Sequence, residues 1–152
     1  MPGKASLQSQ QYYAHKQNAF WYALSPVLGV SAQSSYATKL AALKSQRIAV
    51  WDVLRTCERD GSLDSNIVRG SEQYNDFDAL LGEYPSLKAV LFNGRTAEQL
   101  FLRWRKHSSE LPTARWAGLQ LECMPSTSPA YASMTREQKQ ALWAASLQTA
   151  LS

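Results

Sequence analysis

The chain has 152 residues, of which 45% are hydrophobic and 18% charged, and its formal net charge is +4. This length and composition indicate one globular domain with a core of its own. No apolar run reaches the roughly 18 residues that a membrane span needs, and the first residues lack the pattern of a secretory signal. We therefore expect a cytoplasmic protein, and the mild positive charge is compatible with a nucleic-acid partner without requiring one.

The sequence predicts no metal ion. Cys57 and Cys123 are the only cysteines and lie far apart, and neither His15 nor His107 has a partner at ligand spacing. We expect both thiols to be buried or idle.

Helical and strand patterns alternate along the chain. Apolar spacing and polar caps predict helices over residues 17–24, 35–46, 75–83, 96–106 and 135–151. Apolar runs rich in β-branched and aromatic residues predict buried strands over residues 47–54, 87–92 and 116–123. Because such strands are typical of a sheet covered on both faces, we expect a parallel α/β arrangement.

The expected fold is a single three-layer α/β domain over residues 1–152, with a short central parallel sheet flanked by helices. A doubly wound fold has a strand before its first loop. This chain instead begins with Met1, Pro2 and Gly3, in what reads as a strand-to-helix loop. We therefore expect the first strand to be missing upstream of Met1, which leaves the domain short at its N-terminus.

Four loops follow the real or implied strands and hold the unusual residues of the chain, over residues 2–20, 52–67, 93–95 and 124–132. The carboxyl ends of parallel strands meet at one edge of a sheet, so we expect these loops to converge. The same residues could instead have purely structural roles. Asn93-Gly94 is a common turn, and Asn18 could cap a helix. No P-loop and no nucleophile elbow is present.

Four stretches stand out in this order: MPGKASL…QQYYAHKQNAFW, AVWDVLRTCERDGSLDSNI, LFNGRTAEQLF and MPSTSPAYASMTREQK…LW. Together they resemble the uracil-DNA glycosylase superfamily, and within it the hypoxanthine-DNA (deoxyinosine) glycosylase branch, over nearly the whole chain. The resemblance implies a monofunctional DNA repair glycosylase that hydrolyses the N-glycosidic bond of a flipped deaminated base. The base that the resemblance implies is hypoxanthine, with uracil as a second expected substrate. The partner is double-stranded DNA, and we expect a monomer that uses no metal and no cofactor.

The resemblance also implies roles for individual residues. Pro2 and Gly3 match a Pro-Gly whose backbone lines the base pocket, and Tyr13 falls where a related branch has an aromatic ring that stacks on the flipped base. Asn18 matches the asparagine of an Asn-x-Phe-Trp stretch and is the expected catalytic residue, while Asn93 is expected to face the pocket. The second motif is expected to contact the DNA backbone and wedge into the duplex; it comprises Ser126, Thr127, Ser128, Pro129, Ala130 and Tyr131.

We expect this site to catalyse the reaction mainly by positioning its reactants. A neutral amide such as Asn18 can orient a water molecule but is no strong base, so catalysis rests on geometry and on donors to the leaving base. His15 is the nearest titratable side chain that could protonate a purine, with a structural brace of the loop as the alternative.

Three departures from the family pattern keep other functions open. Met1 stands where the uracil branch has its catalytic asparagine, Lys16 replaces a proline, and we expect the opening strand to be missing upstream of Met1. The alternative is a catalytically impaired DNA-binding member of the same fold. A third interpretation, an enzyme acting on free nucleosides, is disfavoured by the wedge-like stretch PSTSP.

Overall fold

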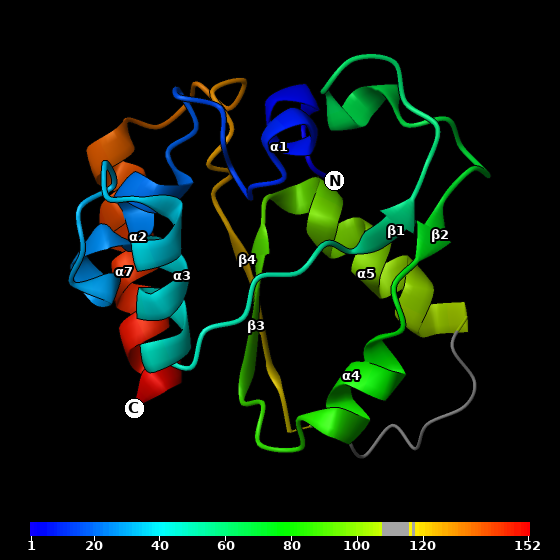
Figure 1. Cartoon of the computed structure of the whole chain (residues 1–152). Helices are drawn as coiled ribbons and strands as arrows, with labels where there is room; N and C mark the ends of the chain where they lie inside the picture. Colours follow the sequence, from blue (N-terminus) through cyan, green and yellow to red (C-terminus); the bar gives the residue numbers. More distant parts are fainter. Residues whose placement is uncertain (108–115, 117) are drawn as a thin grey trace. The chain divides into compact units, whose positions relative to one another are not determined.

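The computed structural model describes residues 1–107, 116 and 118–152. These residues form a mixed α/β structure of helices and short sheets (Figure 1). They divide into two compact units. The sheet unit comprises Met1 and Asp52–Met124, and the helical unit comprises Pro2–Trp51 and Pro125–Ser152. Within the described ranges, no helix is both long enough and apolar enough to cross a lipid bilayer.

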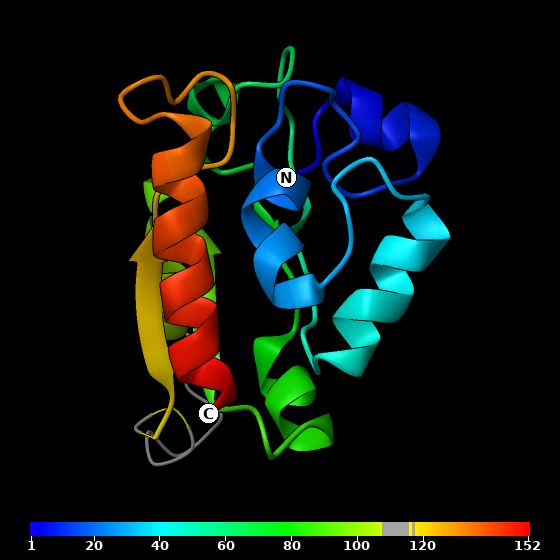
Figure 2. The ribbon, with the colours of Figure 1, turned by 90° about the vertical axis from the view of Figure 1, so that its left-hand side faces the viewer.

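The helical unit is built around two helices that pack along each other. It contains α1 (Lys4–Ser9), α2 (Phe20–Leu28), α3 (Tyr36–Ser45) and α7 (Arg136–Leu151). Figure 2 shows α7 running beside α2. Trp143 of α7 meets Phe20 of α2 edge to face, with ring centroids 6.2 Å apart. The side-chain amide of Gln140 donates to the carbonyl of Tyr22 over 2.7 Å, which ties the two helices together.

Side-chain caps mark the starts of three helices that were predicted from the sequence. The Ser35 hydroxyl accepts a hydrogen bond from the first turn of α3, and Thr135 forms a capping box with Gln138 at the start of α7. Asp76 caps α4 (Phe77–Glu83) in the same way. The predictions over residues 35–46, 75–83 and 135–151 are confirmed, with ends displaced by one or two residues.

The helix α1 lies within a stretch that we expected to be a loop. It is six residues long, has no acidic residue in its first turn and has no side-chain cap. The local signals that locate a helix in a sequence are therefore missing. Its one buried side chain is Ser6, which contacts the segment that follows the helix.

Besides a short 3₁₀ helix over Asp64–Asn66, the described part of the sheet unit contains short strands and α-helices. They are β1 (Leu54–Thr56), β2 (Gln73–Tyr74), β3 (Ala89–Asn93) and β4 (Gln120–Met124), with α4 and α5 (Arg95–His107). β3 and β4 are parallel, and their register runs from Ala89 opposite Gln120 to Asn93 opposite Met124. The parallel pairing of these two predicted strands is thereby confirmed, but the second strand is shorter than the predicted range of residues 116–123, because Trp116 is helical and residue 117 lies outside the described residues. The predicted helix over residues 96–106 is confirmed.

The predicted strand over residues 47–54 is wrong. Only Leu54 belongs to a strand, β1, which pairs antiparallel with β2. An apolar run predicts burial, but a strand also needs a partner to hydrogen-bond with, and the sequence does not name that partner. The described residues therefore form one parallel pair and one antiparallel pair instead of a parallel sheet of the three predicted strands.

Phe101 of α5 is the centre of the core in the sheet unit. Its side chain is fully buried, and its ring meets four others at centroid distances of 5.0 to 5.5 Å. Those rings belong to Phe77, Phe92, Trp104 and Trp116. Such clustered, tilted or edge-on aromatic pairs add to the stabilisation that comes from burial alone.

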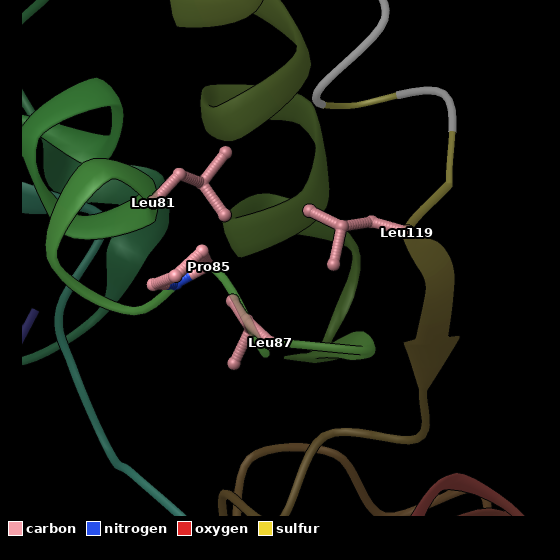
Figure 3. Close-up of a pocket in the computed structure, with 4 residues that line it drawn as sticks. All are labelled: Leu81, Pro85, Leu87 and Leu119. Carbon is pink, nitrogen blue, oxygen red and sulfur yellow. The ribbon is translucent and has the colours of Figure 1, made fainter.

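A small pocket in the sheet unit is lined by Leu81, Pro85, Leu87 and Leu119 (Figure 3). Its volume is about 60 Å³, whereas ligand pockets are usually roughly 300–1,000 Å³. Its lining is apolar apart from backbone groups, so the pocket is a packing gap beside β3 and β4.

The central position of Phe101 predicts a large effect on stability. Phe101→Ala should lower the free energy of unfolding by about 3–5 kcal/mol, because it leaves a cavity among four aromatic rings. The neighbouring Leu102 is 45% exposed, and the control Leu102→Ala should change the same quantity by no more than about 0.5 kcal/mol. Urea unfolding followed by tryptophan fluorescence measures both. Equal effects of the two substitutions would place Phe101 outside the core.

Candidate functional site

The segment between α1 and α2, residues 10–19, is the first of two loops that form the candidate site. It has no regular secondary structure, yet side chains of two helices hold its backbone. The backbone N–H of Tyr12 donates to the Tyr36 hydroxyl of α3 over 3.1 Å. The carbonyl of Tyr12 accepts from the indole N–H of Trp21 in α2, also over 3.1 Å. The backbone N–H and carbonyl of Tyr12 are thereby both hydrogen-bonded, and the first loop is anchored at its start.

Ser6 anchors the middle of the first loop from the other side. It is 8% exposed, and its Oγ accepts a hydrogen bond from the backbone N–H of Ala14 over 3.2 Å. The carbonyl of Ser6 accepts from the N–H of Gln11 over 3.1 Å. The short helix α1 is thus attached directly to the loop that carries the predicted site residues.

Tyr13 is supported by the core. Its ring stacks on Phe20 with centroids 3.8 Å apart and planes 17° from parallel. Phe20 is buried, whereas Tyr13 is half-buried. Tyr13 has a φ of 53°, in the left-handed region that residues other than glycine seldom adopt. The anchored loop holds the ring in this place, with Phe20 behind it, as a platform for stacking requires.

Asn18 closes a turn at the start of α2. Its Oδ1 accepts a hydrogen bond from the N–H of Phe20 over 3.0 Å, and its own N–H donates to the carbonyl of His15 over 2.9 Å. Because a backbone N–H is always a donor, this contact identifies the amide atom facing Phe20 as the oxygen. Among the described residues, the hydrogen bond from Phe20 is the one found for this half-buried side chain, so one lone pair on Oδ1 and the two N–H donors of Nδ2 stay available.

His15 braces the same turn. Its Nδ1 accepts a hydrogen bond from the N–H of Gln17 over 3.3 Å, and its side chain is exposed. An acceptor at Nδ1 means that the neutral ring carries its proton on Nε2. This contact supports the interpretation that His15 braces the loop. The exposed Nε2–H is a further hydrogen-bond donor.

The second loop, residues 125–131, meets the first immediately after Asn18. The N–H of Ala19 donates to the carbonyl of Thr127 over 2.9 Å. Thr127 is 0% exposed, so the bond lies away from water. The indole N–H of Trp143 holds the start of the loop through the carbonyl of Pro125 over 3.0 Å. The structure thus brings together the two segments that the sequence singled out at opposite ends of the chain.

The second loop has a buried base and an exposed tip. Ser126 and Ser128 turn the chain through their hydroxyls, which accept backbone N–H bonds from residues two positions further on. Pro129, Ala130 and Tyr131 are exposed. These three can meet a macromolecule directly, whereas the buried Thr127 joins the loop to the rest of the helical unit.

Lys139 is the residue that the sequence reasoning missed. It lies in α7, is 4% exposed, and its Nζ donates to the carbonyls of Tyr131 and Ser128 over 2.7 Å and 3.3 Å. Burial lowers the pKa of this ammonium group, and the charge of Arg136 lowers it further. Lys139, Trp143 and Leu147 are spaced four residues apart and all buried. A lysine that continues an apolar stripe was the signal in the sequence.

The remaining predicted residues lie at element ends. Gly3 is the N-cap of α1, and its carbonyl accepts from the N–H of Leu7 over 3.0 Å, with Pro2 half-buried before it. Asn93 ends β3 in the sheet unit, whereas the other predicted site residues belong to the helical unit. Gly94 follows with a φ of 95°, which confirms the predicted turn.

The part of the chain that the structure describes contains no group of three or more His, Cys, Asp or Glu side chains placed to hold a metal ion. Cys57 is half-buried and Cys123 exposed, and both are free thiols. The arrangement of the site is therefore one of an aromatic platform, an amide, an imidazole and an exposed loop.

Comparison with known proteins identifies the class. A family model described as the uracil DNA glycosylase superfamily matches residues 1–149, and the chain belongs to this superfamily. The resemblance noted in the sequence is thereby confirmed.

Curated relatives and a solved structure agree with this assignment. A hypoxanthine DNA glycosylase of Methanosarcina acetivorans is 36% identical over 131 residues, which cover 86% of this chain and 75% of the relative. One of Methanosarcina barkeri is 41% identical over 96 residues, 62% of this chain and 60% of that protein. The solution NMR structure of a candidate uracil DNA glycosylase from M. acetivorans matches with a TM-score of 0.75 and 30% identity, over 98% of this chain and 85% of that chain.

The contact between Ser6 and Ala14 predicts a local effect. Ser6→Ala removes the acceptor of the Ala14 N–H, so this amide should exchange its hydrogen faster and the free energy of unfolding should fall by about 1–3 kcal/mol. The control is Ser9→Ala, on the same helix, because the exposed Ser9 hydroxyl bonds only the Ala5 carbonyl of α1 itself. NMR hydrogen exchange and urea unfolding measure the two effects. An unchanged exchange rate at Ala14 in Ser6→Ala would show that Ser6 does not anchor the loop.

Proposed function

We propose that this protein is a monofunctional DNA glycosylase that flips hypoxanthine, and secondarily uracil, out of double-stranded DNA and hydrolyses its N-glycosidic bond. The observation that carries the proposal is the Ala19–Thr127 hydrogen bond, which joins the two loops beside Asn18 in a chain whose relatives are named hypoxanthine DNA glycosylases. We further propose that it acts in the cytoplasm as a monomer, as one three-layer domain.

Base flipping needs compensation for the lost stacking in the duplex, which amounts to a few kcal/mol. Stacking on an aromatic side chain returns roughly 1–3 kcal/mol per base. Tyr13 offers this contact, because its ring is half-buried and backed by Phe20 at a centroid distance of 3.8 Å. We assign Tyr13 to the face of the flipped base.

Bond cleavage places positive charge on the sugar and negative charge on the leaving base. The free lone pair of Asn18 Oδ1 would orient the attacking water, and the donors of Nδ2 would bind acceptor atoms of the base. The bond from the Phe20 N–H holds this amide in place before the substrate arrives. Asn18 therefore acts by position, which suits a neutral side chain that is no strong base.

A hydrogen bond to the leaving purine stabilises the negative charge that it develops. The Nε2–H of His15 is the donor that the first loop provides for this bond, and it keeps its proton, because Nδ1 accepts from the Gln17 N–H and the ring is neutral. The same contact supports the bracing role, and the two roles use different nitrogen atoms of the ring.

The exposed tip of the second loop is assigned to the DNA. Pro129 and Ala130 have the compact, apolar side chains that a wedge between strands requires, and Tyr131 is exposed beside them. The net charge of +4 favours a phosphate backbone and makes binding sensitive to salt.

A catalytically impaired DNA-binding protein is the second candidate. Its support is that Oδ1 of Asn18 already serves the Phe20 N–H, which by itself explains an asparagine at this position. The two candidates differ in whether the glycosidic bond breaks, so excision assays separate them.

Substitutions of Asn18 test the catalytic role. On a duplex with one deoxyinosine, followed by alkaline cleavage of abasic sites, the wild type should excise the base. Asn18→Ala should slow single-turnover excision by about 10²–10³-fold, the effect of losing one preorganised donor elsewhere. Asn18→Asp keeps an acceptor for the Phe20 N–H and lacks the donors, so it should fold normally and be comparably slow.

Gln17→Ala is the matched control, because Gln17 is exposed and adjacent to Asn18. Its excision rate should equal that of the wild type. Wild-type protein that binds deoxyinosine and deoxyuridine duplexes but leaves both intact would establish the second candidate instead.

Substitutions of Tyr13 test the stacking role. Tyr13→Leu should weaken transition-state binding by roughly 1–3 kcal/mol, or about 5- to 150-fold in kcat/KM for deoxyinosine DNA. Tyr13→Phe retains the ring and should stay close to the wild type. The same loss in Tyr13→Phe as in Tyr13→Leu would assign the effect to the hydroxyl and remove the stacking role.

A further inference from the structure

We infer that Lys139 is a positioning residue for base excision from duplex DNA, because its ammonium group holds the tip of the second loop in its wedge conformation. This inference rests on the proposed function. It concerns a side chain in α7 that is 4% exposed and lies beneath the loop that would meet the DNA.

Three contacts connect Lys139 to the tip. Its Nζ donates to the Tyr131 carbonyl over 2.7 Å and to the Ser128 carbonyl over 3.3 Å. The same atom lies 5.2 Å from the centroid of the Tyr131 ring, a cation–π contact. The ammonium group therefore bridges both sides of the turn that carries the exposed Pro129 and Ala130.

The surroundings of Lys139 explain why it holds the loop firmly. A buried charge is costly unless polar groups compensate it. The ion pairs recorded for the described residues do not include Lys139. The two carbonyl dipoles and the Tyr131 ring therefore provide its compensation. Moving the tip away would leave the ammonium without those groups, so the cation and the loop stabilise each other.

The loop is thus held at two points. The carbonyl of Thr127 accepts from Ala19, next to Asn18, and Lys139 holds the chain from Ser128 to Tyr131. The first contact sets where the loop begins, and the second sets where its tip lies. Loss of Lys139 should therefore displace the tip while leaving the bond at Ala19 in place.

This geometry predicts a dependence on DNA structure. Duplex DNA must be opened and the vacated space filled, whereas a base in single-stranded DNA needs no wedge. A displaced tip should impair excision from duplex DNA much more than excision from single strands. A merely destabilised enzyme would lose both activities in the same proportion.

The experiment compares excision of deoxyinosine from a duplex and from the same strand alone. In Lys139→Met, the ratio of the duplex rate to the single-strand rate should fall by about tenfold, as expected for the loss of charge-assisted hydrogen bonds. Lys44→Met is the matched control, because Lys44 is an exposed lysine of α3 in the same unit and its loss changes the net charge equally. Its ratio should stay at the wild-type value.

A measurement without DNA accompanies the assay. Hydrogen exchange at the Ala130 and Tyr131 amides, which bond Ser128 over 3.2 Å and 3.1 Å, should accelerate in Lys139→Met. The Trp143 amide in α7 should not change. Where Lys139→Met fails to fold, Lys139→Gln provides a neutral donor that is one bond shorter, and a smaller drop in the same ratio is expected.

The outcomes separate the two proposals. An unchanged ratio in folded Lys139→Met or Lys139→Gln, with an active wild type, overturns the role of Lys139 and leaves the glycosylase assignment standing. Equal acceleration of exchange at Trp143 and at the tip also overturns it, because the residue then acts on general stability. A wild type that excises from neither substrate overturns the proposed function and this inference with it.

Discussion

The hydrogen bond from the Ala19 N–H to the Thr127 carbonyl is the constraint on which the candidate site depends. It spans 2.9 Å and joins the residue after Asn18 to a fully buried residue of the second loop. Excluded from water, such a bond is strengthened and its loss would leave two backbone groups unsatisfied. Two irregular segments from opposite ends of the chain thereby become neighbours, and every proposed role of Tyr13, Asn18 and the loop tip presupposes that placement.

Helices position these loops through side chains instead of through regular structure. Trp21 and Tyr36 hold the two polar groups of Tyr12, Ser6 holds Ala14, and Lys139 holds the tip. Each contact satisfies a backbone group that a sheet or helix would otherwise have paired. The positions of the two loops therefore depend on the helices that support them. Asn18 combines two functions in the same way, because its oxygen orders the start of α2 and its Nδ2 donors are the ones that we propose for the base.

Much of the fold followed from local signals. The helices predicted from residues 35, 75 and 135 begin within two residues of those positions, and the apolar runs ahead of Asn93 and Met124 located the parallel strands. The strand expected over residues 47–54 failed because burial does not specify a hydrogen-bonding partner. The short helix α1 escaped notice because it lacks a side-chain cap, and its buried serine contacts a residue eight positions away.

The sequence by itself determined the family and the chemical types present at the site, since motif order and residue identity require no coordinates. Only the tertiary structure decided how those residues are used. It showed Thr127 buried, Tyr13 backed by Phe20 and Lys139 beneath the loop tip. The physical reason is that each role depends on contacts between distant segments. Local sequence restricts the dihedral angles of neighbouring residues, but a hydrogen bond from α7 to the second loop exists only once the chain has folded.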